Sequence, residues 1–373
     1  MSKKTHYELF QSQYNFMFGV DEKAREDCDK ENGRGSYMDF AIYQGGFTCV
    51  PENTEYLSPT GWKPIKNLLK TSKLAVYYPD GSIKFEEPKE VFKWKADKWY
   101  DFNTRFIHQT LCPNHKIVYW SDRNPKEIKT IRCEDYVNQG CNQHYKIKNY
   151  FKTNGDISTG LSENELRVLV AYQADGYDYR AIHGNSPRCL GFHLKKERKI
   201  KRLTSLLEKC DKDFTDRPRL NGMKKGYHDI FSTLNLAKYK HFPAKWYQLN
   251  DEELSIILDE VQYWDCTHKH SSIVYSTNSK SDRDFIQFVA ASQGYCTTTY
   301  ERTRNIKIAQ QEKEYIYKNK TEYNVSWTKG KLLSMGKPQV IEAKGGEAKY
   351  CPSTSTGMWV ARCKNHIFVT GNS

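Results

Sequence analysis

Two stretches of the sequence share one pattern, SENELRVLVAYQADG at residues 162–176 and NDEELSIILDEVQYWDC at residues 250–266. Each begins with a Ser or Asn that is followed three residues later by Glu, the capping box that opens a helix. Apolar residues then recur at helical spacing, and each stretch closes on an acid, Asp175 or Asp265. The repeat predicts a domain with an internal pseudo-twofold axis on which the two carboxylates meet.

The pair Asp175 and Asp265 also predicts a reaction. Two carboxylates held close together repel each other, and a divalent cation usually stabilises such a pair, with Mg²⁺ the natural candidate. Metal ions at such a site activate water and stabilise the leaving oxygen of a phosphodiester. We therefore expect Mg²⁺-dependent hydrolysis at these two residues.

The sequence around these stretches divides into parts of different character. Short alternating apolar segments separated by Pro, Gly, Asn and Asp fill residues 49–148 and indicate an all-β module. Helical patterns with strand-like segments between them fill residues 149–340, and β patterns return at residues 341–372. We expect an α/β domain inserted into a β domain, preceded by a separate segment at residues 1–48.

The repeated helices resemble the signature helices of LAGLIDADG homing endonucleases, at LVAYQADG (169–176) and LDEVQYWDC (258–266). The resemblance covers about residues 160–300. It implies an αββαββ fold whose sheets form a basic saddle over double-stranded DNA, with Asp175 and Asp265 as the metal ligands.

The same resemblance makes Lys196 and Lys280 candidates for the basic residue that this family places near its active site. Cys266 departs from the family pattern, which has Gly after the acid. Because that Gly ends the helix in a left-handed conformation, its replacement would distort the second site.

A second set of reactive residues brackets the β module. Cys49 opens the β pattern with a thiol that can attack the preceding carbonyl. At the other end, Asn372, whose side-chain amide can attack its own carbonyl, directly precedes the hydroxyl of Ser373. His115, in CPNHKIVYW (112–120), supplies an imidazole that can protonate a leaving amide nitrogen.

These residues resemble the conserved blocks of inteins, which share the horseshoe-shaped, all-β Hedgehog/intein fold. The resemblance spans about residues 49–140 and 345–373. It implies splicing without a cofactor, by an N–S acyl shift at Cys49, transfer of the N-terminal segment to Ser373 and cyclisation of Asn372.

Other positions match the intein pattern less closely. Cys351, in KYCPSTSTG, stands where the family has an Asp or Cys that helps the transfer step. Cys112 replaces the usual Thr, and Gly371 replaces a frequent His. The other downstream His has no clear counterpart, because His366 has the wrong spacing, so Asn cyclisation would depend on backbone donors or water and be slow.

Removal of residues 49–372 would join GGFT (45–48) to Ser373. The joined sequence fits the first five positions of G-x-x-x-x-G-K-[ST], and DFAIY before it fits the strand that leads into a phosphate-binding loop. YQGGF resembles that loop in phage terminase large subunits. Residues 1–48 are thus expected to start a host ATPase that continues at Ser373, and a Gly-rich turn of another protein is the alternative.

Composition agrees with a nucleic-acid partner. The net charge is +13 and aromatic residues make up 14% of the chain, which favours an anionic partner, although a generally basic surface is an alternative. Eleven cysteines without a repeating spacing indicate reduced thiols and a cytoplasmic location, and no apolar run is long enough for a membrane span. We expect a monomer.

Two alternatives to the combined function stay open, a splicing-defective or free-standing endonuclease and a non-catalytic DNA-binding protein. A zinc site at Cys133, Cys141 and His144 is disfavoured, because these residues lack a CxxC pair and offer at most three ligands.

Overall fold

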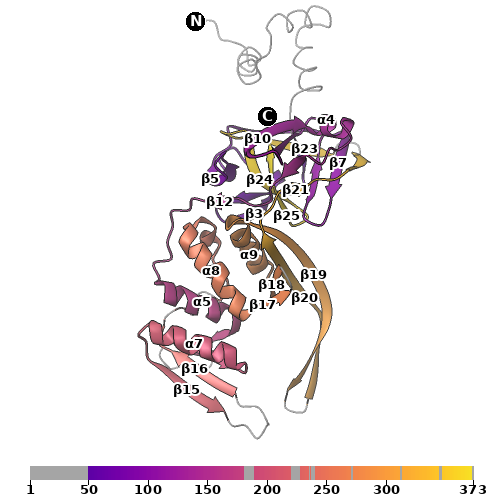
Figure 1. Cartoon of the computed structure of the whole chain (residues 1–373). Coiled ribbons are helices and arrows are strands. Elements are labelled where there is room, and N and C mark those ends of the chain that lie inside the picture. Colours follow the sequence, from indigo (N-terminus) through magenta and orange to yellow (C-terminus); the bar gives the residue numbers. More distant parts are fainter. Residues whose placement is uncertain are drawn as a thin grey trace, which may run out of the picture.

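The computed structural model describes residues 49–179, 189–219, 227–234, 236, 240–269, 272–310, 313–343 and 347–371. The expected host segment 1–48, with its phosphate-loop motif, lies outside the described residues, and so do Asn372 and Ser373. The described chain forms a β module and an α/β domain that lie end to end (Figure 1).

Two separate parts of the chain build the β module. The first part contains strands β1 (Val50–Pro51), β2 (Thr54–Ser58), β3 (Gly61–Pro64), β4 (Leu74–Tyr77), β5 (Ser82–Glu86), β6 (Glu90–Lys95), β7 (Lys98–Asn103), β8 (His108–Leu111), β9 (Lys116–Ser121), β10 (Asn124–Arg132), β11 (Tyr145–Ile147) and β12 (Lys152–Thr153). It also contains the 3-10 turn η2 (Ile65–Asn67) and the short helix α4 (Cys133–Asn138). The second part contains β21 (Leu333–Ser334), β22 (Gln339–Glu342), β23 (Ala348–Ser353), β24 (Met358–Cys363) and β25 (His366–Gly371).

Strand pairing interleaves the two parts. Strand β23 lies between β1 and β6, and β24 lies in a larger sheet between β4 and β2, with β25 paired to β24. Strand β21 pairs with β11, and β22 pairs with β7. Because β21 begins at Leu333, the chain re-enters the β module before residue 341, where the change in sequence pattern placed the boundary. Neither part could form these sheets alone.

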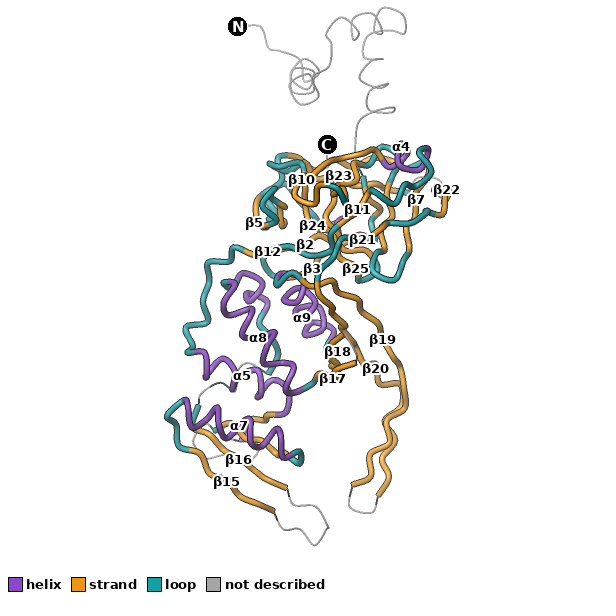
Figure 2. Tube along the Cα trace, in the orientation of Figure 1, coloured by secondary structure: helices purple, strands orange, loops and turns teal. Residues whose placement is uncertain are grey.

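The α/β domain contains two αββαββ repeats. The first repeat contains α5 (Glu163–Asp175), β13 (Gly176–Asp178), β14 (Leu190–Leu194), α7 (Glu197–Lys209), β15 (Phe214–Arg219) and β16 (Tyr227–Ser232). The second repeat follows the 3-10 turn η4 (Ala244–Gln248) and contains α8 (Asp251–Trp264), β17 (Cys266–Lys269), β18 (Ser272–Thr277), α9 (Lys280–Ser292), β19 (Tyr295–Gln310) and β20 (Lys313–Lys329). The sheets have equivalent orders, β13-β14-β16-β15 and β17-β18-β20-β19. The hairpins β15–β16 and β19–β20 extend away from the β module (Figure 2).

The two signature helices begin differently. At α5, the Ser162 hydroxyl accepts from the third helical backbone N–H and the reciprocal bond is also made, so the predicted capping box is present. At α8, Asn250 accepts from the backbone N–H of Glu253 at 2.9 Å. The Glu253 carboxylate is held by the hydroxyls of Ser158 and Thr159 and by the Thr159 backbone N–H. The second helix start is therefore fixed by the connecting segment before α5, a tertiary contact that the local pattern does not encode.

The β module and the α/β domain share apolar packing. One cluster of buried side chains runs from α5, α8 and α9 into the β module, where Leu57 and Val360 belong to it. Gly61 turns the chain at the contact with a φ of +108°, and a Cβ there would lie 3.1 Å from the ring of Tyr247. Only Gly avoids both the left-handed strain and this clash. Among the helices of the described residues, none is both long and apolar enough to cross a membrane.

Candidate functional site

Asp175 and Asp265 meet where α5 and α8 end. Asp175 is the last residue of α5, and Asp265 caps the C-terminus of α8. The Nζ atom of Lys199, on α7, contacts Asp175 and lies 3.8 Å from Asp265. Burial raises the pKa of Asp265, the nearby charge of Asp175 raises it further, and Lys199 offsets part of the rise. The carboxylates thus share a cation, as expected for two acids brought together.

The residue after each acid has a different role from the expected one. Gly176 has a φ of −82°, outside the left-handed region. A Cβ at Gly176 would lie 2.4 Å from a ring carbon of Tyr172, so Gly is needed there for close packing. At the equivalent point Cys266 begins β17 and pairs with Tyr275. The expected distortion at Cys266 is therefore not found, because neither position needs a left-handed residue.

Asp265 opens onto a pocket of about 540 Å³ in the α/β domain. Its other lining residues are Gln173, Ala174, Lys240, His241, Ser276, Thr277, Asn278, Ser279, Asp282 and Glu322. Every lining residue except Ala174 is polar or charged, and the charges are of both signs. Such a pocket suits a charged group that is itself hydrated or metal-bound.

In the pocket, a buried carboxylate is paired with an exposed imidazole. The carboxylate of Asp282 is 1% exposed in its side chain and accepts from His241 Nδ1 at 2.9 Å. It also accepts from Gln173 Nε2 and the Phe242 backbone N–H, both at 3.1 Å. A histidine held in this way is fixed in orientation and tautomer, with Nε2 as its other ring nitrogen.

The lysines at the carboxylates are not those expected from sequence. Lys196 caps the N-terminus of α7, and its charge only slightly offsets the rise in the pKa of Asp265. Lys280 pairs with Asp284 at 3.0 Å, on its own helix.

Lys240, which was not expected, lies near the two acids instead. It donates to the Tyr172 carbonyl at 3.1 Å, and burial lowers its pKa while the nearby acids oppose the shift. Sequence spacing could not single out Lys199 or Lys240, because many lysines lie between the signature helices.

The donor atoms fit a hard divalent cation. Asp175 and Asp265 offer carboxylate oxygens, and each side chain keeps 30% exposure, so water and a phosphate can complete the coordination. Mg²⁺ prefers this arrangement of one or two carboxylates with waters and phosphate oxygens. In the part of the chain that the structure describes, no cluster of three or more His, Cys, Asp or Glu side chains is placed to hold a metal ion. Protein ligands alone would therefore not enclose the ion.

A second group of reactive residues lies in the β module. Cys49, Cys112 and Cys351 are all buried in one small cluster. The β1–β23 register pairs Val50 with Tyr350, so Cys49, one residue earlier, stands opposite Cys351. The backbone N–H of Cys49 donates to Cys112 Sγ at 3.2 Å. Cys112 and Cys351, which come from separate sequence motifs, therefore both lie beside Cys49.

The two neighbouring thiols differ in acidity. Burial raises the pKa of the Cys49 thiol well above its ordinary value, and its hydrogen bonds with Cys112 and Cys351 add to the rise. Burial also raises the pKa of Cys112, but the hydrogen bonds from Cys49 and the charge of Lys349 together outweigh it, so that the net shift of the pKa is downward. Cys112 is therefore the thiol of this pair that ionises first, and its thiolate is the form that can take up a proton.

His115 joins the two parts of the β module. Its Nδ1 lies 3.1 Å from the Cys49 carbonyl oxygen, which also accepts from the Cys112 backbone N–H at 3.2 Å. Its Nε2 contacts the hydroxyl of Thr370 on β25. Because a carbonyl can only accept, Nδ1 carries the proton and Nε2 accepts from Thr370. Burial lowers the pKa of His115 to about 3, so the ring is neutral at pH 7.

The structure changes one expectation at this site and adds a residue that was not expected. Cys112, rather than His115, contacts the nitrogen of Cys49. Thr370 was not anticipated, since it lies 255 residues from its partner His115 and no local signal marks it. His366 starts β25, at the opposite end of the strand from Gly371, and its Nδ1 bonds the Lys364 carbonyl at 3.0 Å. It is therefore not placed to replace the missing downstream histidine.

No protein-family model and no curated protein sequence matches this chain. The solved structures that resemble it include a split intein and homing endonucleases. The class 3 split intein AceL NrdHF, in a splice-inactive variant, is 8% identical over 87% of this chain and 98% of that chain, with a TM-score of 0.33. Variants of the homing endonuclease I-DmoI are 11% identical over 44% of this chain and 88% of that chain, with a TM-score of 0.32.

The protein DUF199/WhiA from Thermatoga maritima is 10% identical over 46% of this chain and 53% of that chain, with a TM-score of 0.30. Other I-DmoI structures contain DNA with Ca, or target DNA with Mg. All of these TM-scores lie below 0.5, so the case for a function rests on the chain's own residues.

Proposed function

We propose that this chain is an intein precursor, in which a splicing element at residues 49–372 carries a Mg²⁺-dependent DNA endonuclease. The β module would be a Hedgehog/intein horseshoe, and the α/β domain a LAGLIDADG endonuclease. The observation that carries the splicing assignment is that His115 bonds both Cys49 and Thr370. Residues next to both expected splice junctions are thereby held at one imidazole.

The first step is an acyl shift at Cys49. The Cys49 thiol gives its proton to the thiolate of Cys112, and the Cys49 sulfur bonds to the carbonyl carbon of Thr48. The bond from that carbon to the Cys49 nitrogen breaks, and the nitrogen takes the proton back from Cys112, whose sulfur already accepts its N–H. His115 holds the Cys49 carbonyl during the shift. Fixed geometry of this kind can supply roughly 7 to 11 kcal/mol of the barrier.

The later steps move to the other junction. The hydroxyl of Ser373 attacks the thioester and releases the Cys49 thiol, which faces Cys351 across the strand pair. The side-chain nitrogen of Asn372 then attacks its own backbone carbonyl carbon and breaks the bond to the Ser373 nitrogen. An O–N acyl shift to that nitrogen leaves a normal peptide bond, and no cofactor is needed.

The endonuclease site is the carboxylate pair with its pocket. Asp175 and Asp265 would hold Mg²⁺, which supplies Lewis acidity at the phosphodiester and a more acidic bound water. Lys199 balances the charge of the two acids, and Lys240 and His241 lie in the pocket beside Asp265. The substrate would be the double-stranded DNA of the uninterrupted host gene, because the insertion destroys that site in its own gene.

The host is proposed to be a phosphate-loop ATPase of the terminase large-subunit type. Its N-terminal segment would be residues 1–48 and its continuation would begin at Ser373. The support is the sequence match at Gly45 to Thr48.

One precursor tests both activities. The chain is extended by about ten residues after Ser373 and analysed by mass spectrometry, and the purified product is incubated with DNA that carries the uninterrupted host sequence and Mg²⁺. We expect a ligated peptide that reads Phe47-Thr48-Ser373, an excised element ending in a cyclised Asn372, and a specific double-strand break. A chain that stays at the precursor mass and leaves the DNA intact would contradict the proposal.

A further inference from the structure

Helix α9 of the α/β domain packs against the hairpin that leads to the C-terminal junction. The hairpin consists of β24 and β25, with a tight turn in which Lys364 and Asn365 have φ angles of 42° and 65°. Strand β25 pairs with β24 up to Gly371, directly before Asn372. The position of β25 therefore depends on how β24 and the turn are held.

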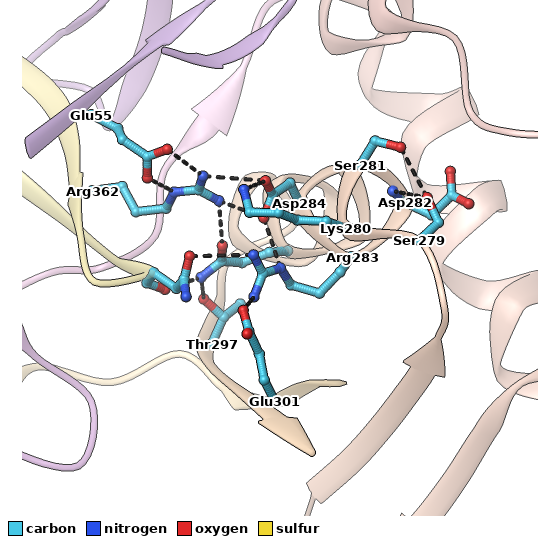
Figure 3. A network of polar contacts seen from close by, with 12 residues as sticks. Glu55, Ser279, Lys280, Ser281, Asp282, Arg283, Asp284, Thr297, Glu301 and Arg362 are labelled. Atoms are coloured by element: carbon cyan, nitrogen blue, oxygen red, sulfur yellow. Dashed lines mark hydrogen bonds and ion pairs between the residues drawn. The ribbon is translucent and has the colours of Figure 1, made fainter. Parts of the chain in front are cut away.

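Arg362, on β24, joins the β module to α9. Its side chain is fully buried, and its Nε and Nη2 atoms donate to the two carboxylate oxygens of Glu55 at 2.6 and 3.0 Å. Its Nη1 and Nη2 atoms donate to Asp284 of α9 at 2.8 and 3.3 Å. Figure 3 shows the guanidinium between these two acids.

A second α9 residue completes the hydrogen bonds of this guanidinium. The second N–H of Nη1 has an acceptor in Gln287 Oε1, at 3.2 Å. Every N–H of Arg362 is thereby satisfied, two by Glu55 and three by residues of α9. Without α9, a buried cation would keep one carboxylate and lose the acceptors for most of its donors. Removal of one partner from a buried ion pair is costly because it leaves an uncompensated charge.

The turn of the hairpin is bonded to the same helix. Gln287 Nε2 donates to the Asn365 backbone carbonyl at 2.6 Å, and Arg283 Nη2 donates to Asn365 Oδ1 at 3.3 Å. Arg283 is itself fully buried and donates to Asp284 at 2.7 Å. One polar face of α9 thus holds both the strand and the turn of the hairpin, at two points that no residue of the β module supplies.

We propose that Asp284 and Gln287 of the α/β domain are positioning residues for the C-terminal splice junction, because they fix hairpin β24–β25 through Arg362 and Asn365. The inference rests on the proposed splicing function. It makes the inserted domain a structural part of the splicing machinery rather than a removable passenger. Strand β25 transmits the effect, since one end is held at the turn and the other at the Thr370–His115 contact.

The test separates the two junctions of the extended precursor. Asp284→Asn removes the charge that Arg362 needs, and a misplacement of about 1 Å at a reacting group can cost up to about 100-fold in rate. We expect release of the C-terminal segment to slow by about tenfold or more, whereas thiol-induced cleavage at Cys49 changes less than about twofold. The N-terminal site keeps most of its rate because the backbone N–H and the thiol of Cys112 still hold Cys49 when the Thr370–His115 contact loosens, and neither bond involves α9 or the hairpin. Asp284→Glu, which keeps the charge, should recover part of the rate.

Glu208→Gln is the matched control, since Glu208 is an exposed acid on α7 of the same domain. All variants are compared at a temperature where circular dichroism shows equal folding. Equal slowing of both cleavages in Asp284→Asn, or no slowing, would overturn the inference.

Amide hydrogen exchange of β25 gives an answer that does not depend on splicing. Exchange of the amides of residues 367–370 should be faster in Asp284→Asn than in wild type and in Glu208→Gln. If wild type itself fails to cleave, the splicing proposal fails, and unchanged exchange in Asp284→Asn then also overturns the hairpin inference.

Discussion

His115 contacts Cys49 through one ring nitrogen and Thr370 through the other, although 66 residues separate it from Cys49 and 255 residues separate it from Thr370. The α/β domain lies between these partners in the sequence. The contact therefore exists only because the two parts of the β module interleave their strands. It brings the proposed splicing residues to one place although a whole domain separates them in the sequence.

The first prediction concerns pH and His115. The pKa of this buried ring is about 3 in the folded protein and 6.5 when it is exposed, so the unfolded chain binds the proton more readily. The free energy of unfolding that depends on the neutral form of His115 is fully present above pH 6.5. It is lost as the pH falls toward 3, because protons bind to the unfolded chain first. At pH 5 the loss from this one group is about 2 kcal/mol.

This loss is measured as the difference in pH dependence between variants. Thermal unfolding is followed between pH 7 and 5 in wild type, His115→Gln and His144→Gln, where His144 is an exposed control. The fall in stability should be smaller in His115→Gln than in the other two. An identical fall in all three would show that His115 is not buried as a neutral ring.

The two ends of the splicing element should fail differently. With Cys49→Ala no thioester forms, so ligation and N-terminal cleavage stop, while Asn372 can still release the C-terminal segment. With Asn372→Ala the acyl shift remains, so a branched species or thiol-inducible release of residues 1–48 should accumulate. Mass spectrometry of the extended precursor resolves these products, and the same product pattern in both variants would refute the assigned roles.

Cys112 should be needed for the first of these steps. Its sulfur accepts the N–H of Cys49, and it is the thiol of the two that ionises first and can therefore relay a proton. Cys112→Ser keeps a hydrogen-bonding group with a much higher pKa, so thiol-inducible N-terminal cleavage should slow by about tenfold or more. Cys133→Ser, which alters another buried thiol of the module, is the control. Equal rates in wild type and Cys112→Ser would show that a group other than Cys112 transfers the proton.

The signature acids should matter for DNA cleavage alone. Asp175→Asn or Asp265→Asn removes a proposed ligand of Mg²⁺, so cleavage of the uninterrupted host sequence should fall by at least about 100-fold. Splicing and DNA affinity, measured with Ca²⁺ in place of Mg²⁺, should stay close to wild type. Full cleavage by both variants would end the endonuclease assignment.

His241 should contribute a proton-transfer step to the same reaction. Its ring is oriented by buried Asp282 and shares a pocket with Asp265, so His241→Ala should slow cleavage by about 10- to 100-fold. Added imidazole should restore part of the rate, because the native side chain is 68% exposed. His228→Ala is the control, since His228 faces Asp216 in a second His–Asp pair at 3.4 Å. If added imidazole does not restore the rate of His241→Ala, His241 has a structural role instead.

The local patterns of the sequence predicted much of the architecture. Caps, apolar spacing and terminal acids located both α5 and α8, because helix starts and amphipathic faces are set within a few residues. The same patterns placed Asp175 and Asp265 at equivalent helix ends. Separation of β and helical patterns indicated the inserted domain, although the return to the β module begins at Leu333.

Local patterns did not predict the side chains from distant segments that contact these site residues. Lys199 and Lys240 stand at the acids, where Lys196 and Lys280 were expected, because the packing of α7 and of the segment after β16 decides which of many lysines arrives there. The expected reason for Gly after the acid was likewise wrong. Gly176 is needed because a Cβ would clash with Tyr172, not because its backbone is left-handed, and Cys266 occupies the equivalent position in a strand.

By itself, the sequence determined the repeated helices, the paired acids and the reactive residues that flank the β module, since each depends on residue type and short spacing. Only the tertiary structure decided that Cys112 faces the Cys49 nitrogen, that Thr370 meets His115, and that Arg362 takes its counter-charge from Asp284. These contacts join segments that are far apart in the sequence. Sheet register and domain packing bring the segments together, and neither can be predicted from a single short stretch of the chain.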